Sequence, residues 1–132
     1  MKTILITGAA QGIGLATAKL YASRGWYVGL YDLNREGIEQ LLASGDFPNG
    51  CGDYCDVTDF ESIRAMFTHF SSNTDGRLDL LVNNAGVLSA GGFHAIDHNK
   101  HELMIDVNIT GATNVLQLGY PLLKQTPGAT VV

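Results

Sequence analysis

The sequence has 132 residues, the length of one ordinary domain that can bury a core without disulfide or metal staples. Its formal net charge of -5 disfavours nucleic acid and anionic membranes as partners, and no stretch approaches the roughly 20 apolar residues that cross a bilayer. The only two cysteines, Cys51 and Cys55, lie in one short segment, so we expect a reducing, cytoplasmic setting.

Short β-rich apolar runs alternate with longer segments of helical period along the whole chain. This pattern predicts an α/β fold of three layers, Rossmann-like, in which right-handed crossovers build a doubly wound parallel sheet. The predicted strands cover residues 3–7, 27–31, 51–55, 78–82 and 129–132. The predicted helices cover residues 12–24, 35–43, a segment that follows Thr58 as its N-cap, and 97–124 with Asp97 as its N-cap.

Apolar residues at helical spacing predict which face of each helix packs on the sheet. In the first helix, this face should contain Ile13, Ala16, Thr17, Leu20 and Tyr21. In the helix after Thr58, it should contain Phe60, Ile63, Phe67 and Phe70. In the last helix, the apolar positions are Leu103, Val107, Val115, Leu118 and Leu122.

The segment from Thr7 to Gly14 lies where the first strand turns into the first helix, and it is rich in glycine. Glycines at such a turn let the chain bend sharply and approach a diphosphate closely, while the helix amino terminus offers free N–H donors. The spacing is Gly-x-x-x-Gly-x-Gly, with a longer first gap than the common dinucleotide fingerprint. We expect the turn to bind a cofactor diphosphate through Gly8, Gln11, Gly12, Ile13 and Gly14.

Asp32 follows the second predicted strand. At this position an acidic side chain can accept hydrogen bonds from the adenosine ribose hydroxyls of a dinucleotide. The 2′-phosphate of NADP would meet this carboxylate instead of a cation, so NADP should bind less tightly. The sequence therefore predicts NAD (NADH) as the cofactor. Arg35, three residues later, leaves NADP as the less favoured alternative.

These features together resemble the short-chain dehydrogenase/reductase family, in the subgroup that carries Thr-Gly-x-x-x-Gly-x-Gly at this turn. The resemblance extends over all 132 residues and adds three further motifs to the glycine turn and Asp32. It implies that Asp56 and Val57 border the adenine ring, and that the Asn83-Asn84-Ala85-Gly86 segment steadies the sheet and lines the cofactor cleft through Asn84, Ala85 and Gly86. It also implies a catalytic role for Asn108, which would hold a water in a proton relay.

The activity that this resemblance implies is hydride transfer between a nicotinamide and an alcohol or carbonyl substrate, a small molecule. In the family, a Ser and a Tyr-x-x-x-Lys pair after the fifth strand handle the proton. Tyr120 and Lys124 have that spacing, but they precede the fifth strand, so we do not expect them to be catalytic. We therefore expect residues 1–132 to form a single NAD(P)-binding domain that is incomplete at its carboxyl end and inactive alone.

The substrate pocket and the assembly are less closely defined by the sequence. We expect Phe93 and the loop at residues 89–92 to border the substrate pocket, and the resemblance implies a homo-oligomer, a tetramer or dimer. No metal site is expected, because Cys51 and Cys55 lack a second pair of ligands at suitable spacing. The alternative to an enzyme is a non-catalytic nucleotide-binding or interaction module, which turnover with NADH and generic carbonyls would contradict.

Overall fold

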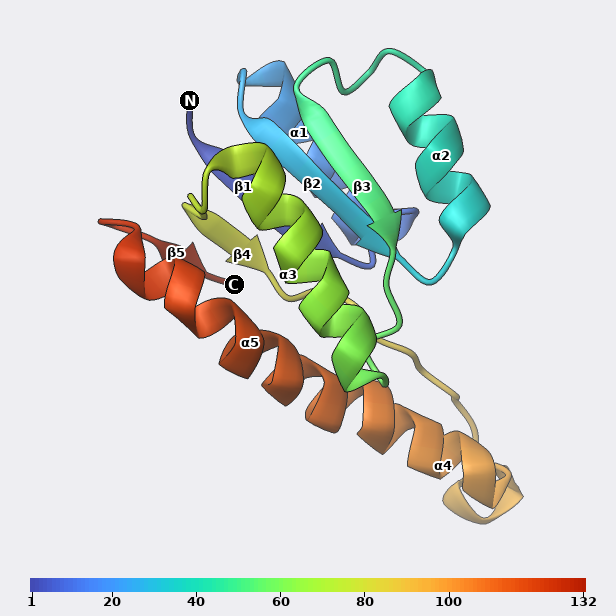
Figure 1. The fold of residues 1–132 in the computed structure, drawn as a ribbon. Coiled ribbons are helices and arrows are strands. Elements are labelled where there is room, and N and C mark those ends of the chain that lie inside the picture. The colour runs from blue at the N-terminus through green and yellow to red at the C-terminus, as the bar shows by residue number, and fades with distance from the viewer.

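An open sheet of five parallel strands forms the centre of the computed structural model, which describes residues 1–132 (Figure 1). The strands lie in the order β3-β2-β1-β4-β5. Their bounds are Thr3–Thr7 for β1, Tyr27–Asp32 for β2, Gly50–Tyr54 for β3, Leu80–Val82 for β4 and Thr130–Val131 for β5. The winding reverses between β1 and β4, and ligands of open α/β sheets bind at such a switch point, outside the carboxyl ends of the strands.

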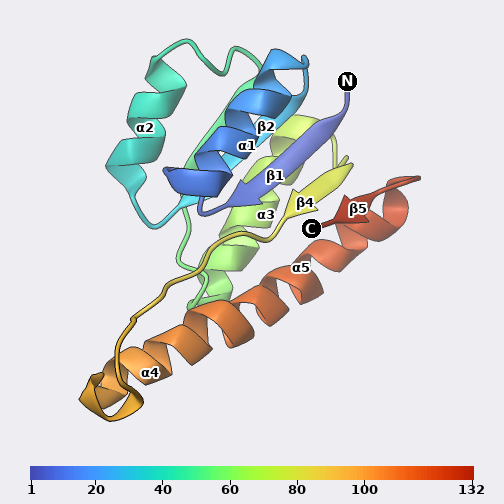
Figure 2. The same ribbon diagram turned by 180° about the vertical axis from the view of Figure 1, so that it is seen from behind.

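Helices cover both faces of the sheet, so the predicted three-layer, doubly wound architecture is confirmed (Figures 1 and 2). Helices α1 (Gly12–Ser23) and α2 (Arg35–Ala43) lie on one face, and α3 (Phe60–Thr74) and α5 (Ala112–Gln125) lie on the other. Helix α4 (His98–Ile105) extends beyond the sheet, next to a short 3-10 turn at Phe93–Ala95. No helix has both the length and the apolar character that a membrane span requires.

The core consists of two apolar clusters, one on each face of the sheet. Alternate residues of β1 supply both, because successive side chains of a strand point to opposite faces. Leu5 belongs to the cluster under α3 and α5, whereas Ile4 and Ile6 belong to the cluster under α1 and α2. All five residues of β1 are buried, as expected for the central strand of a parallel sheet covered on both sides.

The face of α1 that packs on the sheet differs from the prediction. Ile13 is 77% exposed and Leu20 is 47% exposed, whereas Gly14 and Ala18 are the buried residues of this helix. Small side chains let the helix backbone approach the sheet and the preceding turn closely. The prediction was wrong for Ile13, Ala16 and Leu20, which are exposed. Tyr21 does pack on the core as predicted, together with Leu15.

Several boundaries differ from the sequence prediction by one or two residues, and local side-chain hydrogen bonds accompany two of these differences. The N-cap of α3 is Asp59, whose carboxylate accepts a hydrogen bond from the Glu61 amide, while the Thr58 hydroxyl bonds to Asp56 instead. Strand β4 begins at Leu80, not at residue 78. Asp79, directly before this strand, bonds to Thr3 and Thr130 through its backbone. Its carboxylate also accepts hydrogen bonds from the Thr3 amide and the Arg77 guanidinium.

The predicted last helix is continuous but contains a π-helical segment at Asp106–Gly111, between α4 and α5. Within it, Gly111 lies so close to the Val57 carbonyl that a Cβ atom there would approach the oxygen to 2.9 Å. Leu103 and Phe60, both expected to be buried, are partly exposed, and Asp97 lies at the N-cap position without a side-chain cap bond. Val107, Val115 and the remaining apolar residues of α3 are buried as predicted.

Candidate functional site: a cavity at the carboxyl ends of the strands

The turn between β1 and α1 has a backbone that only glycine adopts easily. Gly8 and Gly12 have φ angles of 69° and 59°, in the left-handed region. Gly14 is required for a different reason, because a Cβ atom there would lie 2.2 Å from the Gly8 carbonyl oxygen. The first hydrogen bond of α1 is donated by Leu15 to the Gln11 carbonyl. The amides of Gly12, Ile13 and Gly14 precede that bond, and the Gln11 side chain does not cap them.

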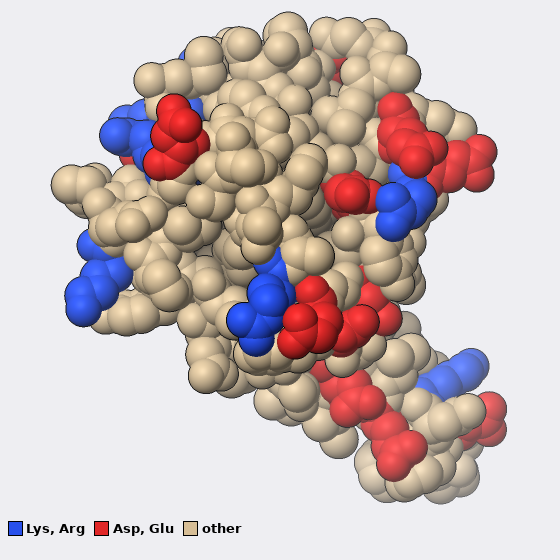
Figure 3. Space-filling view, in the orientation of Figure 1, with Lys and Arg blue, Asp and Glu red and all other residues tan.

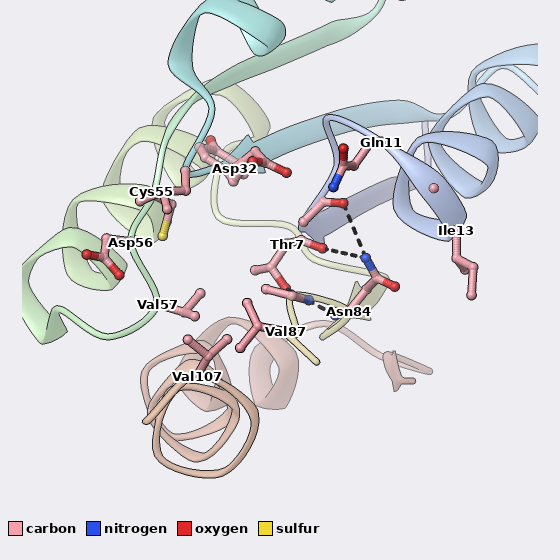
Figure 4. Close-up of a pocket in the computed structure, with 16 residues that line it drawn as sticks. Thr7, Gln11, Ile13, Asp32, Cys55, Asp56, Val57, Asn84, Val87 and Val107 are labelled. Carbon is pink, nitrogen blue, oxygen red and sulfur yellow. Dashed lines mark hydrogen bonds between the residues drawn. The ribbon is translucent and has the colours of Figure 1, made fainter. Parts of the chain in front are cut away.

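Thr7 and Asn84 tie this turn to the segment that follows β4 (Figure 4). The Thr7 hydroxyl accepts hydrogen bonds from the Asn84 and Ala85 amides, both at 3.1 Å. The Asn84 side-chain amide donates to the carbonyls of Thr7 and Gly8, at 3.1 and 3.3 Å. The two loops at the switch point are therefore fixed against each other by four hydrogen bonds across the sheet edge.

A cavity of about 420 Å³ lies where these loops meet, at the carboxyl ends of β1, β2, β3 and β4. Every residue predicted to bind the cofactor lines it, except Gly14. Those lining residues are Gly8, Gln11, Gly12, Ile13, Asp32, Asp56, Val57, Asn84, Ala85 and Gly86. Six residues that were not predicted from the sequence also line the cavity, and most of them are direct neighbours of predicted ones: Thr7, Tyr31, Leu33, Cys55, Val87 and Val107.

Asp32 is half-buried at the end of β2, and each of its carboxylate oxygens accepts a hydrogen bond from a backbone amide. Oδ2 accepts a hydrogen bond from Ala10 at 3.0 Å, and Oδ1 accepts one from Asn34 at 2.9 Å. A carboxylate has about four lone-pair positions, so each oxygen can accept a further hydrogen bond from a ligand. Asp32 thus connects the glycine turn to the start of α2 and retains acceptor capacity toward the cavity.

The wall formed after β3 combines one carboxylate with apolar and thiol groups. The Asp56 carboxylate accepts hydrogen bonds from the amide and the hydroxyl of Thr58 through one oxygen, at 2.9 and 2.7 Å. Val57 and Val107 lie near each other at the lower side of the cavity (Figure 4). Burial raises the pKa of the Cys55 thiol to about 11, so this cavity-lining cysteine is a protonated, weakly nucleophilic group at neutral pH.

Asn108 lies in the π-helical segment and does not line the cavity. Its side chain pairs with the backbone of Val87, accepting from the amide and donating to the carbonyl, both at 2.8 Å. Val87 is itself a lining residue, directly after Gly86. Asn108 therefore holds one cavity wall in place, and π segments often occur at functional sites.

We expect Asn108→Ala to loosen this wall. The loss of both hydrogen bonds should accelerate hydrogen exchange at the Val87 amide and lower the free energy of unfolding by about 1–2 kcal/mol. Thr113→Ala is the control, because it removes an exposed hydroxyl bonded to the Ile109 carbonyl on the same helix. Unchanged exchange at Val87 in the Asn108 variant would contradict this assignment.

Several other conspicuous side chains lie away from the cavity. Tyr120 and Lys124 lie near the end of α5, with the Lys124 ammonium 6.0 Å from the Tyr120 ring, and neither lines the cavity. Phe93 is exposed and contacts His101. No group of three or more His, Cys, Asp or Glu side chains lies close enough to hold a metal ion. The substrate-side role of Phe93 stays a prediction.

A parallel sheet of this strand order, with a glycine turn and an acidic residue facing one cavity at its carboxyl edge, defines a Rossmann-like α/β domain. The family model described as "short chain dehydrogenase" matches residues 2–132. The chain therefore belongs to the short-chain dehydrogenase family.

Relatives of known name agree with this assignment. The chain is 39% identical to oxidoreductase UcpA of Salmonella typhimurium over 137 residues, which cover 99% of this chain and 50% of that protein. It is 36% identical to D-threitol dehydrogenase of Mycolicibacterium smegmatis, covering 98% of this chain and 51% of that protein. The chain spans about half the length of the curated relatives it matches.

Solved structures show the same fold. The crystal structure of a short-chain type dehydrogenase/reductase from Mycobacterium marinum superposes with a TM-score of 0.88 at 27% sequence identity. The match covers 98% of this chain and 53% of that chain. The predicted family and the predicted Rossmann-like α/β fold are therefore both confirmed.

Proposed function

We propose that this chain binds NAD(H) in the cavity and forms the cofactor-binding part of an oxidoreductase that acts on a small alcohol or carbonyl substrate. Membership of the short-chain dehydrogenase family supports the oxidoreductase class. The single observation that carries the choice of cofactor is the position of Asp32, whose carboxylate lines the same cavity as the glycine turn. NADP(H) would bring a 2′-phosphate toward this negative charge.

The residues present fit a dinucleotide. At one end of the cavity, Gly12 has open space where a side chain would stand, and the first amides of α1 have no partner within the helix. These groups suit a diphosphate, which takes hydrogen bonds from a helix amino terminus. The first turn of α1 contains no acidic residue that would repel such an anion.

The other half of the cavity suits an adenosine. Asp32 would accept hydrogen bonds from the ribose hydroxyls, and Asp56 has a carboxylate oxygen that Thr58 leaves free for an amino group. Val57 offers an apolar surface to a ring system. When bound, the nicotinamide would supply the hydride acceptor or donor.

In this proposal the chain's own residues bind and position, and they leave proton transfer to other groups of the whole protein. Asn84 and Thr7 fix the two loops that face the nicotinamide end of the cavity, and Asn108 holds Val87 beside them. A water held by Asn108 would extend its role from positioning to the proton relay. The cytoplasmic setting and the homo-oligomer stay predictions.

The test of the cofactor assignment is a calorimetric titration with NADH. We expect one binding site per chain, and we expect Asp32→Ala to weaken NADH binding by about tenfold, because hydrogen bonds to a charged acceptor are lost. Asp32→Asn removes the charge and keeps one acceptor oxygen, so it retains a partner for only one of the two backbone amides that bond to Asp32. Asp46→Ala, which removes an exposed acid paired with Lys19, should leave the affinity unchanged.

Failure of the folded, unmodified protein to bind NADH would contradict the proposal. Binding without any turnover of alcohols or carbonyls by the whole protein would favour the alternative of a non-catalytic nucleotide-binding module.

A further inference from the structure

Arg35 is the first residue of α2 and the cation that follows Asp32 most closely along the chain. Its guanidinium lies toward β3: Nη1 is 2.6 Å from Oδ1 of Asp53, and the group stands 5.2 Å from the centre of the Tyr54 ring. Neither Arg35 nor any other Lys or Arg lines the cavity. Arg35, which follows Asp32 at the junction of β2 and α2, is therefore held away from the ligand site.

Asp53 is itself fixed by its own strand. Its Oδ1 accepts a hydrogen bond from the Tyr54 amide at 2.7 Å, so the carboxylate oxygen that binds Arg35 has a defined position. The Tyr54 ring provides a second, weaker attraction through its π face. Two consecutive residues of β3 thus restrain one guanidinium.

The electrostatic surroundings of this junction are acidic. Asp32 lies on the cavity side, Asp53 lies on the β3 side, and Glu36 follows Arg35 in the first turn of α2. On the face drawn in Figure 3, Lys and Arg side chains are scattered singly, and most lie beside Asp or Glu side chains. A phosphate that arrives near Asp32 finds no unengaged cation in the cavity wall.

We propose that Asp53 is a positioning residue for cofactor selectivity, because it holds Arg35 against β3 and so denies a 2′-phosphate the guanidinium that would neutralise it. This inference rests on the proposed function, since it concerns the adenosine end of the same NAD(H) site. Asp32 repels the 2′-phosphate by its own charge. Asp53 acts indirectly, because its ion pair with Arg35 keeps the guanidinium away from the phosphate. Selectivity for NAD(H) then depends on a residue that lies outside the cavity.

The expected size of the effect is modest. The Arg35 and Asp53 side chains are 57% and 48% exposed, and an exposed ion pair restrains its partners only weakly. Release of Arg35 should therefore tighten NADPH binding by about three- to fivefold. NADH carries no 2′-phosphate, so its affinity should change by less than about twofold.

The experiment compares the dissociation constants for NADPH and NADH, measured by calorimetry at fixed ionic strength, in the unmodified protein and in four variants. Asp53→Ala removes the restraint, and Asp53→Asn removes its charge while keeping an acceptor for the Tyr54 amide. Arg35→Gln with Asp53→Ala tests whether the gain in NADPH affinity passes through Arg35. Glu36→Gln is the charge control. It removes the negative charge of a neighbouring carboxylate, which accepts a hydrogen bond from Gln40.

The proposal requires tighter NADPH binding in both Asp53 variants, no such gain in the double variant, and a smaller gain in Glu36→Gln. An equal gain in the double variant, whose net charge is unchanged, would mean that the effect does not pass through Arg35. An equal gain in Glu36→Gln would mean that only net charge matters. Either result would overturn the proposal. An unchanged NADPH-to-NADH ratio in the Asp53 variants, with NADH affinity intact, would also overturn it while leaving the proposed function standing. Absence of NADH affinity in the unmodified protein would instead overturn the proposed function, and this inference with it.

Discussion

Replacement of Gly14 by alanine should abolish measurable NADH binding and lower the free energy of unfolding by about 1–3 kcal/mol. The new Cβ atom would stand 2.2 Å from the Gly8 carbonyl oxygen and 2.7 Å from the Asn84 side-chain nitrogen. Backbone cannot yield as a flexible side chain does, so α1 must move away from the glycine turn. That movement separates the helix amino terminus from the loop with which it forms the proposed diphosphate site.

Calorimetry with NADH and urea denaturation measure the two effects separately. Ala16→Ser is the matched control, since Ala16 lies two residues further along α1 on its exposed side. This variant should bind NADH as the unmodified protein does. A Gly14→Ala variant that binds NADH within about twofold of the unmodified affinity would show that the close approach of α1 to Gly8 is not needed for the site.

The parts of the fold that sequence reasoning predicts correctly are those with strong local signals. Apolar β-rich runs indicate the strands, and the turn from Thr7 to Gly14 was placed correctly because closely spaced glycines between a strand and a helix strongly favour a sharp bend there. Parallel strands bring their carboxyl ends to one edge, and this is why residues as distant as Gly8, Asp32 and Asn84 line one cavity.

The parts that sequence reasoning misses depend on partners far away in the chain or on small residues. The predicted face of α1 is wrong in part, because the fully buried positions are Gly14 and Ala18, and a search for large apolar residues overlooks such small residues. The π segment around Asn108 has no local composition signal. The pairing of Arg35 with Asp53 appears only when β2 and β3 lie side by side.

Thr7 makes a long-range contact of this kind, between the end of β1 and the segment that follows β4, and we expect it to contribute strongly to the stability of the site. It is a buried residue at the end of the central strand, and its hydroxyl accepts hydrogen bonds from two successive amides, those of Asn84 and Ala85. Thr7→Val keeps the shape of the side chain but removes the acceptor that these two amides share. Each unpaired buried donor costs about 1–3 kcal/mol, so we expect the free energy of unfolding to fall by about 2–4 kcal/mol.

Thr7→Ser is the matched variant, because it keeps the hydroxyl and deletes only a methyl group, at a cost of about 1 kcal/mol. Urea denaturation of the two variants therefore separates the hydrogen bonds from the packing. NADH affinity should fall in Thr7→Val as well, since Asn84 and Ala85 line the cavity and would lose their fixed position. Equal stability of the Val and Ser variants would mean that the two amides find other partners, and the connection between the loops would then rest on the Asn84 side chain alone.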